Sequence, residues 1–327
     1  MKGLIIKMKI SKEKLDQLKS FIDQAETIAI ASHVDPDGDN LGSTLGFARS
    51  LRNYGKDVDV IGHDEIDDYL KFLPDLEYYS KDHRDSYDLF FVLDASEMER
   101  IGTALPIAQN SKKTAVVDHH VGGGIQTDLN IIVDDSPATC ELIYEIIDRL
   151  DLPLDKITAG LLFTGIVTDT GRFLYTNVTE NTFVTAGKLS TAGADMEYIY
   201  RNLYQSKPIK VMQFENEMIA NAEFIGNKVF AVASKDLVEK HGVQIGDAEN
   251  VVNQLRDLDG VNVSMIIKEY GPNEFKASLR SKDVDVSKTA RENGGGGHIR
   301  ASGFTIFADD INQAREKALK ILESIND

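Results

Sequence analysis

The chain has 327 residues, of which 42% are hydrophobic and 27% charged, enough for two domains with packed cores. The formal net charge is −17. Proteins that bind long nucleic acid normally carry an excess of basic residues, so we expect any nucleotide bound by this protein to be short. No apolar run approaches the roughly 20 residues needed to span a bilayer, and the single cysteine, Cys140, excludes an internal disulfide, so we expect a cytoplasmic protein with no membrane partner.

Short apolar strands alternate with amphipathic helices in the first half of the chain. We predict strands that begin at Thr27, Asp57, Tyr87 and Thr114. Helical spacing of the apolar residues predicts helices at residues 41–55, 138–150 and 155–167. Strands that alternate with helices are typical of an α/β domain with a mostly parallel sheet, and we assign residues 1–185 to such a domain.

The pattern changes in the second half of the chain. Residues 179–213 predict a continuous helix with polar interruptions, and we interpret residues 186–215 as a helical connector. Three alternating strands follow, NKVFAVAS, VNVSMIIKEY and EFKASLRS, with helices at residues 247–258 and 311–324. Residues 216–327 are therefore predicted to form a smaller α+β domain, which carries a glycine run at residues 294–297.

Acidic and imidazole side chains gather just after the predicted strands of the first domain. They are His33, Asp37 and Asp39, then Asp94, then Asp118, His119 and His120, with Asp169 near the end of an apolar helix. Because the carboxyl ends of parallel strands open onto one crevice, four separate segments would deliver these groups to one place. An aspartate at a strand end is in general more often a turn residue or a helix cap, so the coincidence of all four segments carries the prediction.

Such a cluster would repel itself unless a cation were bound. Like charges in a partly buried site disfavour ionisation, whereas a dication favours deprotonated ligands. Mixed imidazole and carboxylate ligands suit Mn²⁺, Fe²⁺ or Co²⁺, and Mg²⁺ or Zn²⁺ remain open. Two ions about 3.5–4 Å apart would clamp a phosphoryl group and activate water, which predicts a phosphoesterase.

The ordered motifs SHVDPDGDNLGS, VLDASEMERIG, VVDHH and TGIVTDTGRF resemble those of the DHH phosphoesterases. GGGGHIRASG is similar to the signature of the DHH-associated C-terminal domain, so the resemblance covers nearly the whole chain. Among subfamilies the chain is most similar to the bacterial nanoRNase/pAp phosphatase group, which includes cyclic-di-AMP and pApA phosphodiesterases.

This resemblance implies a role for each residue of the cluster. His33 and Asp37 would hold one ion, Asp39, His119 and Asp169 the other, and Asp94 would bridge both. Asp118 would orient a ligand, and His120 would face the scissile phosphate. The usual ion of the family is Mn²⁺. Asp35 is interpreted as a turn residue, and Arg100 either contacts substrate or pairs with a nearby carboxylate.

The glycine run is interpreted as part of a substrate pocket. Glycines permit positive φ and close approach of a ligand, so main-chain N–H groups can face an anion; an isolated run of this kind is otherwise a flexible turn. The predicted pocket consists of Arg280, Gly295, Gly296, Gly297, His298, Arg300 and Ser302. By resemblance, this domain would capture the nucleotide end that is not cleaved.

We therefore predict a two-metal hydrolase of short nucleotides: oligoribonucleotides of a few residues, pApA or 3′-phosphoadenosine 5′-phosphate. Alternatives are a cyclic-di-AMP phosphodiesterase, a single-strand exonuclease, an inorganic pyrophosphatase and a nucleotide sensor without turnover. Relatives of this kind are commonly homodimers, although no apolar stripe in the sequence demands one. The remaining histidines, His63, His83 and His241, are interpreted as surface residues.

Overall fold

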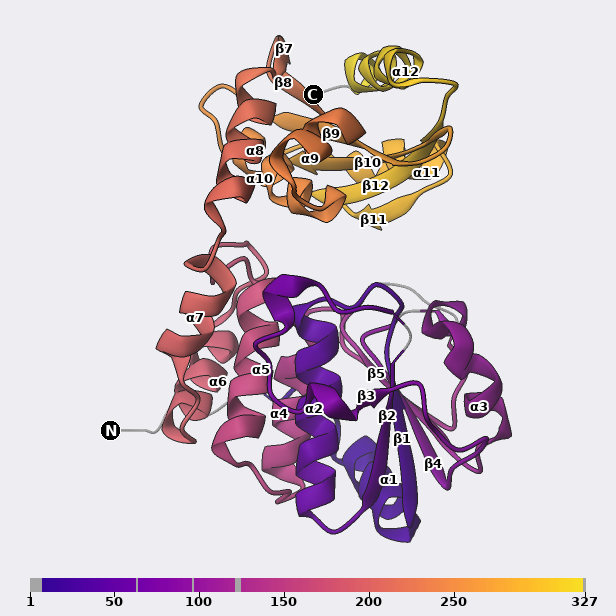
Figure 1. The fold of residues 1–327 in the computed structure, drawn as a ribbon. Helices are drawn as coiled ribbons and strands as arrows, with labels where there is room; N and C mark the ends of the chain where they lie inside the picture. Colours follow the sequence, from indigo (N-terminus) through magenta and orange to yellow (C-terminus); the bar gives the residue numbers. More distant parts are fainter. Residues whose placement is uncertain (1–7, 63, 96, 121–124, 326–327) are drawn as a thin grey trace. The chain divides into compact units, whose positions relative to one another are not determined.

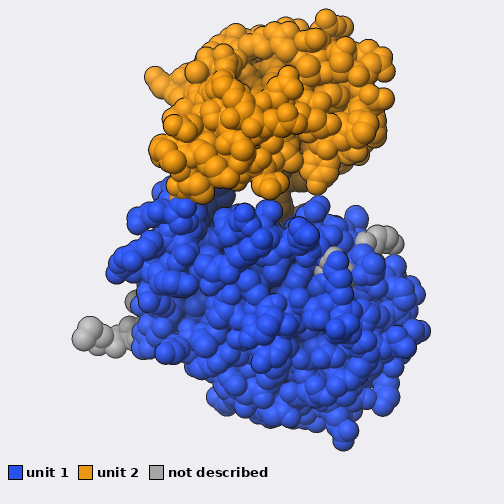
Figure 2. Space-filling view, in the orientation of Figure 1, with its two compact units in different colours: residues 1–206 blue, residues 207–327 orange. Residues whose placement is uncertain are grey.

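The structure is a computed structural model that describes residues 8–62, 64–95, 97–120 and 125–325. The chain divides into two compact units, residues 1–206 and residues 207–327, each with its own sheet (Figures 1 and 2). The predicted fold class, an α/β domain with a parallel sheet followed by a smaller α+β domain, is confirmed. No helix among the described residues is long and apolar enough to cross a membrane.

Unit 1 is built on a parallel sheet of six strands. They are β1 (Thr27–Ala31), β2 (Asp57–Ile61), β3 (Tyr79–Ser80), β4 (Leu89–Leu93), β5 (Thr114–Asp118) and β6 (Leu129–Ile132). Their spatial order is β3-β2-β1-β4-β5-β6, and every neighbouring pair is parallel. Strands β2 and β3 therefore lie on one side of β1, and β4, β5 and β6 lie on its other side.

Helices cover both faces of this sheet. They are α1 (Lys12–Gln24), α2 (Gly38–Asn53), α3 (Leu105–Asn110), α4 (Thr139–Arg149) and α5 (Lys156–Asp169), with short 3₁₀ helices η1 (Asp68–Leu70), η2 (Leu76–Tyr78) and η3 (Met98–Ala104). Alternate residues of β1 enter different cores: Ile28 and Ile30 pack with α1, α2, α4 and α5, whereas Ala29 and Ala31 pack with η3 and α3. The strands are therefore buried on both faces, as their continuous apolar runs predict.

Glycines let the helices of unit 1 pack closely. A Cβ on Gly42 of α2 would lie 2.6 Å from the carbonyl oxygen of Leu161 in α5. A Cβ on Gly165 of α5 would lie 2.3 Å from Sγ of Cys140 in α4. The backbones of α2, α4 and α5, which lie side by side in Figure 1, can approach this closely only without those side chains.

The prediction of one continuous helix over residues 179–213 is wrong. This segment forms α6 (Glu180–Thr191), α7 (Met196–Tyr204) and the first turn of α8 (Ile209–Ala220). Gly193, with a φ of 100°, turns the chain after α6, and Pro208 is the N-cap of α8. Helices α6 and α7 belong to unit 1 and α8 to unit 2, so the segment expected to form a separate connector is divided between the units.

Unit 2 has a mixed six-stranded sheet. Its strands are β7 (Glu223–Ile225), β8 (Lys228–Ala233), β9 (Val263–Gly271), β10 (Glu274–Ser281), β11 (Gly296–His298) and β12 (Ala301–Phe307), and its helices after α8 are α9 (Lys235–His241), η4 (Ile245–Ala248), α10 (Glu249–Arg256), α11 (Val286–Glu292) and α12 (Ile311–Ser324). Among the described strands of this sheet, β8 and β9 are the only pair that runs in parallel. Met265 and Ile267 of β9 pack with α11 and α12, and Ile266 packs with α8 and α10.

Candidate metal centre

The candidate site lies at the carboxyl ends of neighbouring strands in unit 1. Strands β1 and β4 are adjacent in space but not consecutive in sequence, so the strand order reverses between them. His33 follows β1, Asp94 directly follows β4, and Asp118 ends β5. Open parallel sheets bind their ligands at such a reversal of strand order.

One group of ligand atoms comes from His33, Asp37 and Asp94. Nε2 of His33 lies 3.4 Å from Oδ2 of Asp94 and 4.0 Å from Oδ1 of Asp37. Nδ1 of His33 is 2.7 Å from the carbonyl oxygen of Val34, a contact that needs a proton on Nδ1 and leaves Nε2 to face the carboxylates. These three side chains are placed closely enough to hold one ion.

A second group comes from Asp39, His119 and Asp169. Nε2 of His119 lies 3.3 Å from Oδ2 of Asp169 and 3.9 Å from Oδ2 of Asp39. The same nitrogen lies 3.4 Å from Oδ1 of Asp94. Asp94 therefore faces both groups, one with each carboxylate oxygen.

The N-terminus of α4 holds two of these carboxylates in place. The backbone N–H groups of Thr139 and Cys140 donate to the two oxygens of Asp39, at 2.6 and 2.9 Å, and the Thr139 hydroxyl donates to Oδ1 of Asp94 at 3.1 Å. Orphan N–H groups at a helix N-terminus favour an anion. Sequence reasoning missed Thr139; its signal was a threonine at the start of a predicted helix, which is in general a capping residue.

Asp94 adopts an uncommon backbone conformation. Its φ is 54°, in the left-handed region, and its side chain is only 2% exposed. Aspartate tolerates this region better than most residues, yet strain of about 1–3 kcal/mol there persists only where the surroundings impose it. The turn after β4 thus directs the Asp94 carboxylate into the cluster.

Asp118 orients His120 rather than His119. Oδ1 of Asp118 accepts hydrogen bonds from the backbone N–H groups of both histidines, at 2.8 and 3.2 Å, and lies 2.7 Å from Nδ1 of His120. Nδ1 of His119 instead lies 3.2 Å from the carbonyl oxygen of Ser136. Each imidazole therefore has a different partner that fixes its ring.

The electrostatics of the cluster favour a bound cation. Burial raises the pKa of Asp39 well above its ordinary value, and the charges of Asp94 and Asp169 raise it further. Burial, together with the charge of Asp37, raises the pKa of Asp169 to about 6. Burial alone would lower the pKa of His119, but Asp169 and Asp94 outweigh it and raise the value to about 12. The cluster therefore retains protons that divalent cations would displace.

The donor set fits divalent metal ions. Nε2 of His119 is buried and has no hydrogen-bond partner among the described residues, although three carboxylates surround it. No lysine or arginine forms an ion pair with Asp37, Asp39, Asp94 or Asp169 within the described part of the chain. Two imidazoles and four carboxylates, of which Asp94 faces both imidazoles, form a ligand set suited to Mn²⁺ and similar ions.

Arg100 and Asp35 flank this cluster. The carbonyl oxygen of Arg100 accepts a hydrogen bond from the N–H of Val34 at 2.8 Å, and its half-buried side chain forms no ion pair with a described residue. Asp35 has a φ of 57°, and its N–H donates to Asp64 at 2.8 Å. Arg100 thus braces the loop after β1 through its backbone, and Asp35 occupies a turn.

The seven residues of the predicted substrate pocket lie in unit 2, and their environments differ. Arg280 bonds to Oε1 of Glu249 at 3.1 Å, so this arginine already has a carboxylate partner. Gly296, Gly297 and His298 form β11, which pairs with β12. His298 and Arg300 are exposed, and Gly295 is half-buried.

Ser302 differs from the other residues of the predicted pocket. Its side chain is 6% exposed, and its hydroxyl donates to the carbonyl oxygen of Val286 at 2.9 Å. The hydroxyl thus joins β12 to α11, and the role of Ser302 in the predicted pocket stays a prediction.

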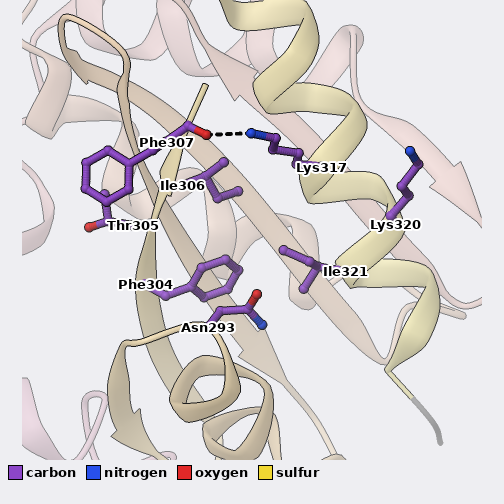
Figure 3. A pocket seen from close by; sticks show the side chains of 8 residues that line it. All are labelled: Asn293, Phe304, Thr305, Ile306, Phe307, Lys317, Lys320 and Ile321. Atoms are coloured by element: carbon purple, nitrogen blue, oxygen red, sulfur yellow. Dashed lines mark hydrogen bonds between the residues drawn. The ribbon is translucent and has the colours of Figure 1, made fainter. Parts of the chain in front are cut away.

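A separate depression of about 460 Å³ lies between β12 and α12 (Figure 3). It is lined by Asn293, Phe304, Thr305, Ile306, Phe307, Lys317, Lys320 and Ile321. Nζ of Lys317 donates to the carbonyl oxygen of Phe307 at 2.7 Å across one side of it. None of the predicted substrate residues lines this depression.

His83 and His241 belong to none of the candidate metal groups found among the described residues. His83 is exposed, as predicted, whereas His63 lies outside the described residues. The surface interpretation of His241 is wrong: its side chain is 14% exposed, and Nε2 lies 2.8 Å from Oε2 of Glu217. Its ring also packs on Phe214, with 6.0 Å between the ring centroids.

Comparison with known proteins identifies two domains. The DHH family N-terminal domain matches residues 27–166, and the DHHA1 domain matches residues 226–324. The bifunctional oligoribonuclease and PAP phosphatase NrnA of Thermus thermophilus is 29% identical over 296 residues, which are 90% of this chain and 88% of that protein. The protein of the same name from Bacillus subtilis is 29% identical over 293 residues, 87% and 91% of the two chains.

Among solved structures, an exopolyphosphatase-related protein from Bacteroides fragilis is similar over the whole chain. The TM-score is 0.89 at 26% sequence identity, with 97% of each chain covered.

Proposed function

Because the chain belongs to the DHH family of phosphoesterases, with a DHHA1 domain after its DHH domain, we propose that it hydrolyses short nucleotides to mononucleotides with two divalent metal ions. One observation carries the proposal. Asp94 faces both ligand groups: Oδ2 lies 3.4 Å from Nε2 of His33, and Oδ1 lies 3.4 Å from Nε2 of His119. A carboxylate placed in this way suits a pair of ions better than a single one.

In this proposal His33 and Asp37 hold one ion, Asp39, His119 and Asp169 hold the other, and Asp94 contacts both. When bound, the ions supply activated water and neutralise charge on the phosphoryl group. Mn²⁺ is the ion we propose, and the mixed imidazole and carboxylate ligands support it, with Mg²⁺, Co²⁺ and Fe²⁺ as alternatives.

The chain's own residues position the reacting groups. The helix α4 holds Asp39 and Asp94 at fixed positions through Thr139 and Cys140. Asp118 fixes the ring of His120 through Nδ1, and we propose that this imidazole contacts the scissile phosphate. Preorganised groups of this kind contribute most of the catalysis in phosphoryl transfer.

Short nucleotides are the proposed substrates. The relatives from Thermus thermophilus and Bacillus subtilis, named as oligoribonucleases and PAP phosphatases, support oligoribonucleotides of a few residues, pApA and 3′-phosphoadenosine 5′-phosphate. The net charge of −17 also favours short over long nucleic acid. We propose that the glycine run, Arg280, His298 and Arg300 bind the end that is not cleaved, and that the protein acts in the cytoplasm as a homodimer.

The test is hydrolysis with Mn²⁺ of pApA, 3′-phosphoadenosine 5′-phosphate, cyclic-di-AMP, inorganic pyrophosphate and a twenty-nucleotide RNA, with Asp94→Ala as control. We expect turnover of the first two, slow cleavage of the long RNA and loss of at least about a thousandfold in the variant. Removal of the ions with EDTA should abolish turnover, and added Mn²⁺ should restore it.

Other outcomes would replace the proposal. Equal rates on the dinucleotide and on the long RNA would indicate a single-strand exonuclease, and preference for cyclic-di-AMP would indicate a cyclic dinucleotide phosphodiesterase. Cleavage of pyrophosphate alone would indicate a pyrophosphatase. Binding of Mn²⁺ and nucleotide with no turnover of any substrate would indicate a sensor.

A further inference from the structure

An unusual backbone turn follows the candidate ligand Asp169. Gly171, Arg172 and Phe173 have φ values of 53°, 65° and 65°, three consecutive residues in the left-handed region. The hydroxyl of Thr170 accepts a hydrogen bond from the N–H of Phe173 at 3.1 Å, and the N–H of Arg172 donates to the carbonyl oxygen of Val167 at 2.8 Å. Strained non-glycine residues of this kind cluster at ligand sites.

This turn places Arg172 on an aromatic ring. Cζ of Arg172 lies over the ring of Tyr204, 4.9 Å from its centroid, at the end of α7. The Arg172 side chain is exposed and forms no hydrogen bond or ion pair with a described residue. Arg172 follows the candidate ligand Asp169 closely in the chain, and its guanidinium keeps one face on Tyr204 while its donors stay available to a ligand.

Other exposed aromatic rings surround this pair. Tyr69 is 46% exposed and Tyr175 is 45% exposed, and Tyr204 itself is 37% exposed. The ring of Tyr175 lies against Gly171, where an added Cβ would come within 2.3 Å of Cζ. The carboxylate of Asp169 contributes to raised pKa values of both Tyr69 and Tyr204, after the larger effect of burial, which places their hydroxyls within electrostatic reach of the cluster.

We propose that the Arg172 guanidinium, supported from behind by the Tyr204 ring, stacks on the nucleobase of the nucleotide whose phosphate lies at the metal centre. Bases splayed out of a helix are commonly held on guanidinium planes and aromatic rings, and stacking tolerates any base. A cation–π contact with Tyr204 restrains the guanidinium and so lowers the entropy cost of stacking on a base. This subsite lies wholly in unit 1, and the inference rests on the proposed function.

The test compares Arg172→Ala with wild type on pApA and on its analogue in which the nucleotide beside the scissile phosphate lacks a base. We expect KM for pApA to rise about tenfold in the variant with little change in kcat, since base stacking binds ground and transition states alike. The abasic analogue should show the same KM with both proteins. Tyr204→Leu should change KM in the same direction by a smaller factor. Arg201→Ala, an exposed arginine of α7 that pairs with Glu197, serves as the control.

The outcomes separate three explanations. An equal rise in KM on both substrates would show that Arg172 binds phosphate, and this result would overturn the proposal. A fall in kcat on both substrates with an altered Mn²⁺ requirement would show a structural effect on Asp169 and would also overturn it. If wild type hydrolyses neither substrate, the proposed function fails, and calorimetric binding of AMP against ribose 5-phosphate then decides. In that case Arg172→Ala should weaken the binding of AMP but not that of ribose 5-phosphate. An unchanged affinity for AMP would reject the stacking subsite.

Discussion

The side-chain hydroxyl of Thr139 donates a hydrogen bond to Oδ1 of Asp94 at 3.1 Å, although 45 residues separate the two in sequence. The backbone N–H of Thr139 donates at the same time to Oδ2 of Asp39 at 2.6 Å. One residue at the start of α4 thus fixes the relative position of two carboxylates from different strand ends. Groups that orient metal ligands in this way contribute strongly to metal affinity and activity.

Replacement of Thr139 by valine should weaken the metal centre without unfolding the protein. Valine has nearly the same shape and keeps the backbone bond to Asp39, but it removes the donor to Asp94. We expect Mn²⁺ affinity or kcat/KM to fall about tenfold, measured by calorimetric titration and by hydrolysis of pApA. Thr139→Ser, which retains the hydroxyl, should keep most of the activity. An equal fall of Mn²⁺ affinity or kcat/KM in both variants would show that Thr139 contributes through its packing rather than through the hydrogen bond.

Gly165→Ala should disturb both packing and the metal centre. The added Cβ would lie 2.3 Å from Sγ of Cys140 and 2.6 Å from Oδ1 of Asp39. We expect a loss of about 1–3 kcal/mol in the free energy of unfolding and weaker Mn²⁺ binding, because the Asp39 carboxylate must move. Gly160→Ala in the same helix meets only Ile199, at 3.7 Å, and should stabilise α5 by about 0.5–1 kcal/mol. Denaturant unfolding with and without Mn²⁺ measures the free energy of unfolding of both variants and how much Mn²⁺ adds to it. Similar values for Gly165→Ala and Gly160→Ala would refute this prediction.

The strand-end residues of unit 1 could be predicted from sequence because their chemistry follows local patterns. His33, Asp94 and His119 each follow or end a short apolar run, and a parallel sheet brings such positions together. The family resemblance, read from the motifs, is confirmed by the match to both domains. The clustering needed only the order of strands and helices, whereas the role expected of each residue came from the family resemblance.

Residues whose role depends on tertiary contacts could not be found in this way. The bond from Thr139 to Asp94 requires the packing of α4 against the sheet, and nothing local distinguishes Thr139 from an ordinary capping residue. The burial of the Ser302 hydroxyl depends on α11. The helical spacing of apolar residues likewise continues through Gly193, although the chain turns there with a positive φ after α6. Apolar periodicity cannot reveal a turn between two packed helices.

Asp88 should make stability depend on pH in the acid range. Its carboxylate accepts hydrogen bonds from the N–H groups of Glu26 and Thr27, both at 3.0 Å, and from Nζ of Lys112 at 2.7 Å, so it joins the starts of β1 and β4. The Lys112 bond and these N–H groups hold the pKa of Asp88 well below its ordinary value near 3.8. A lowered folded-state pKa stabilises the protein above the unfolded-state value, and this stabilisation is lost as pH falls toward the folded-state value.

Asp88→Asn should therefore lower the free energy of unfolding by about 1–3 kcal/mol at pH 7. The difference from wild type should shrink progressively below about pH 4, as the wild-type carboxyl becomes protonated in the unfolded state. Urea unfolding of both proteins at several pH values measures this difference in the free energy of unfolding. Asp16→Asn, which removes an exposed partner of Lys12, should change stability little at any pH. A pH-independent difference for Asp88→Asn would show that shape rather than charge matters there.

Substitution of Gly296 tests whether the glycine run at residues 294–297 binds a ligand or only turns the chain. A Cβ at Gly296 would meet no protein atom within 4 Å and its backbone is not in the left-handed region, so Gly296→Ala should leave the melting temperature unchanged. If the main chain of the glycine run faces the substrate, the added methyl group should nevertheless raise KM for pApA by about tenfold, because it blocks close approach of the ligand. Gly246→Ala, at another open position in unit 2, should change neither quantity. An unchanged KM in Gly296→Ala would mean that the run only turns the chain between α11 and β12, and that substrate capture in unit 2 depends on its side chains.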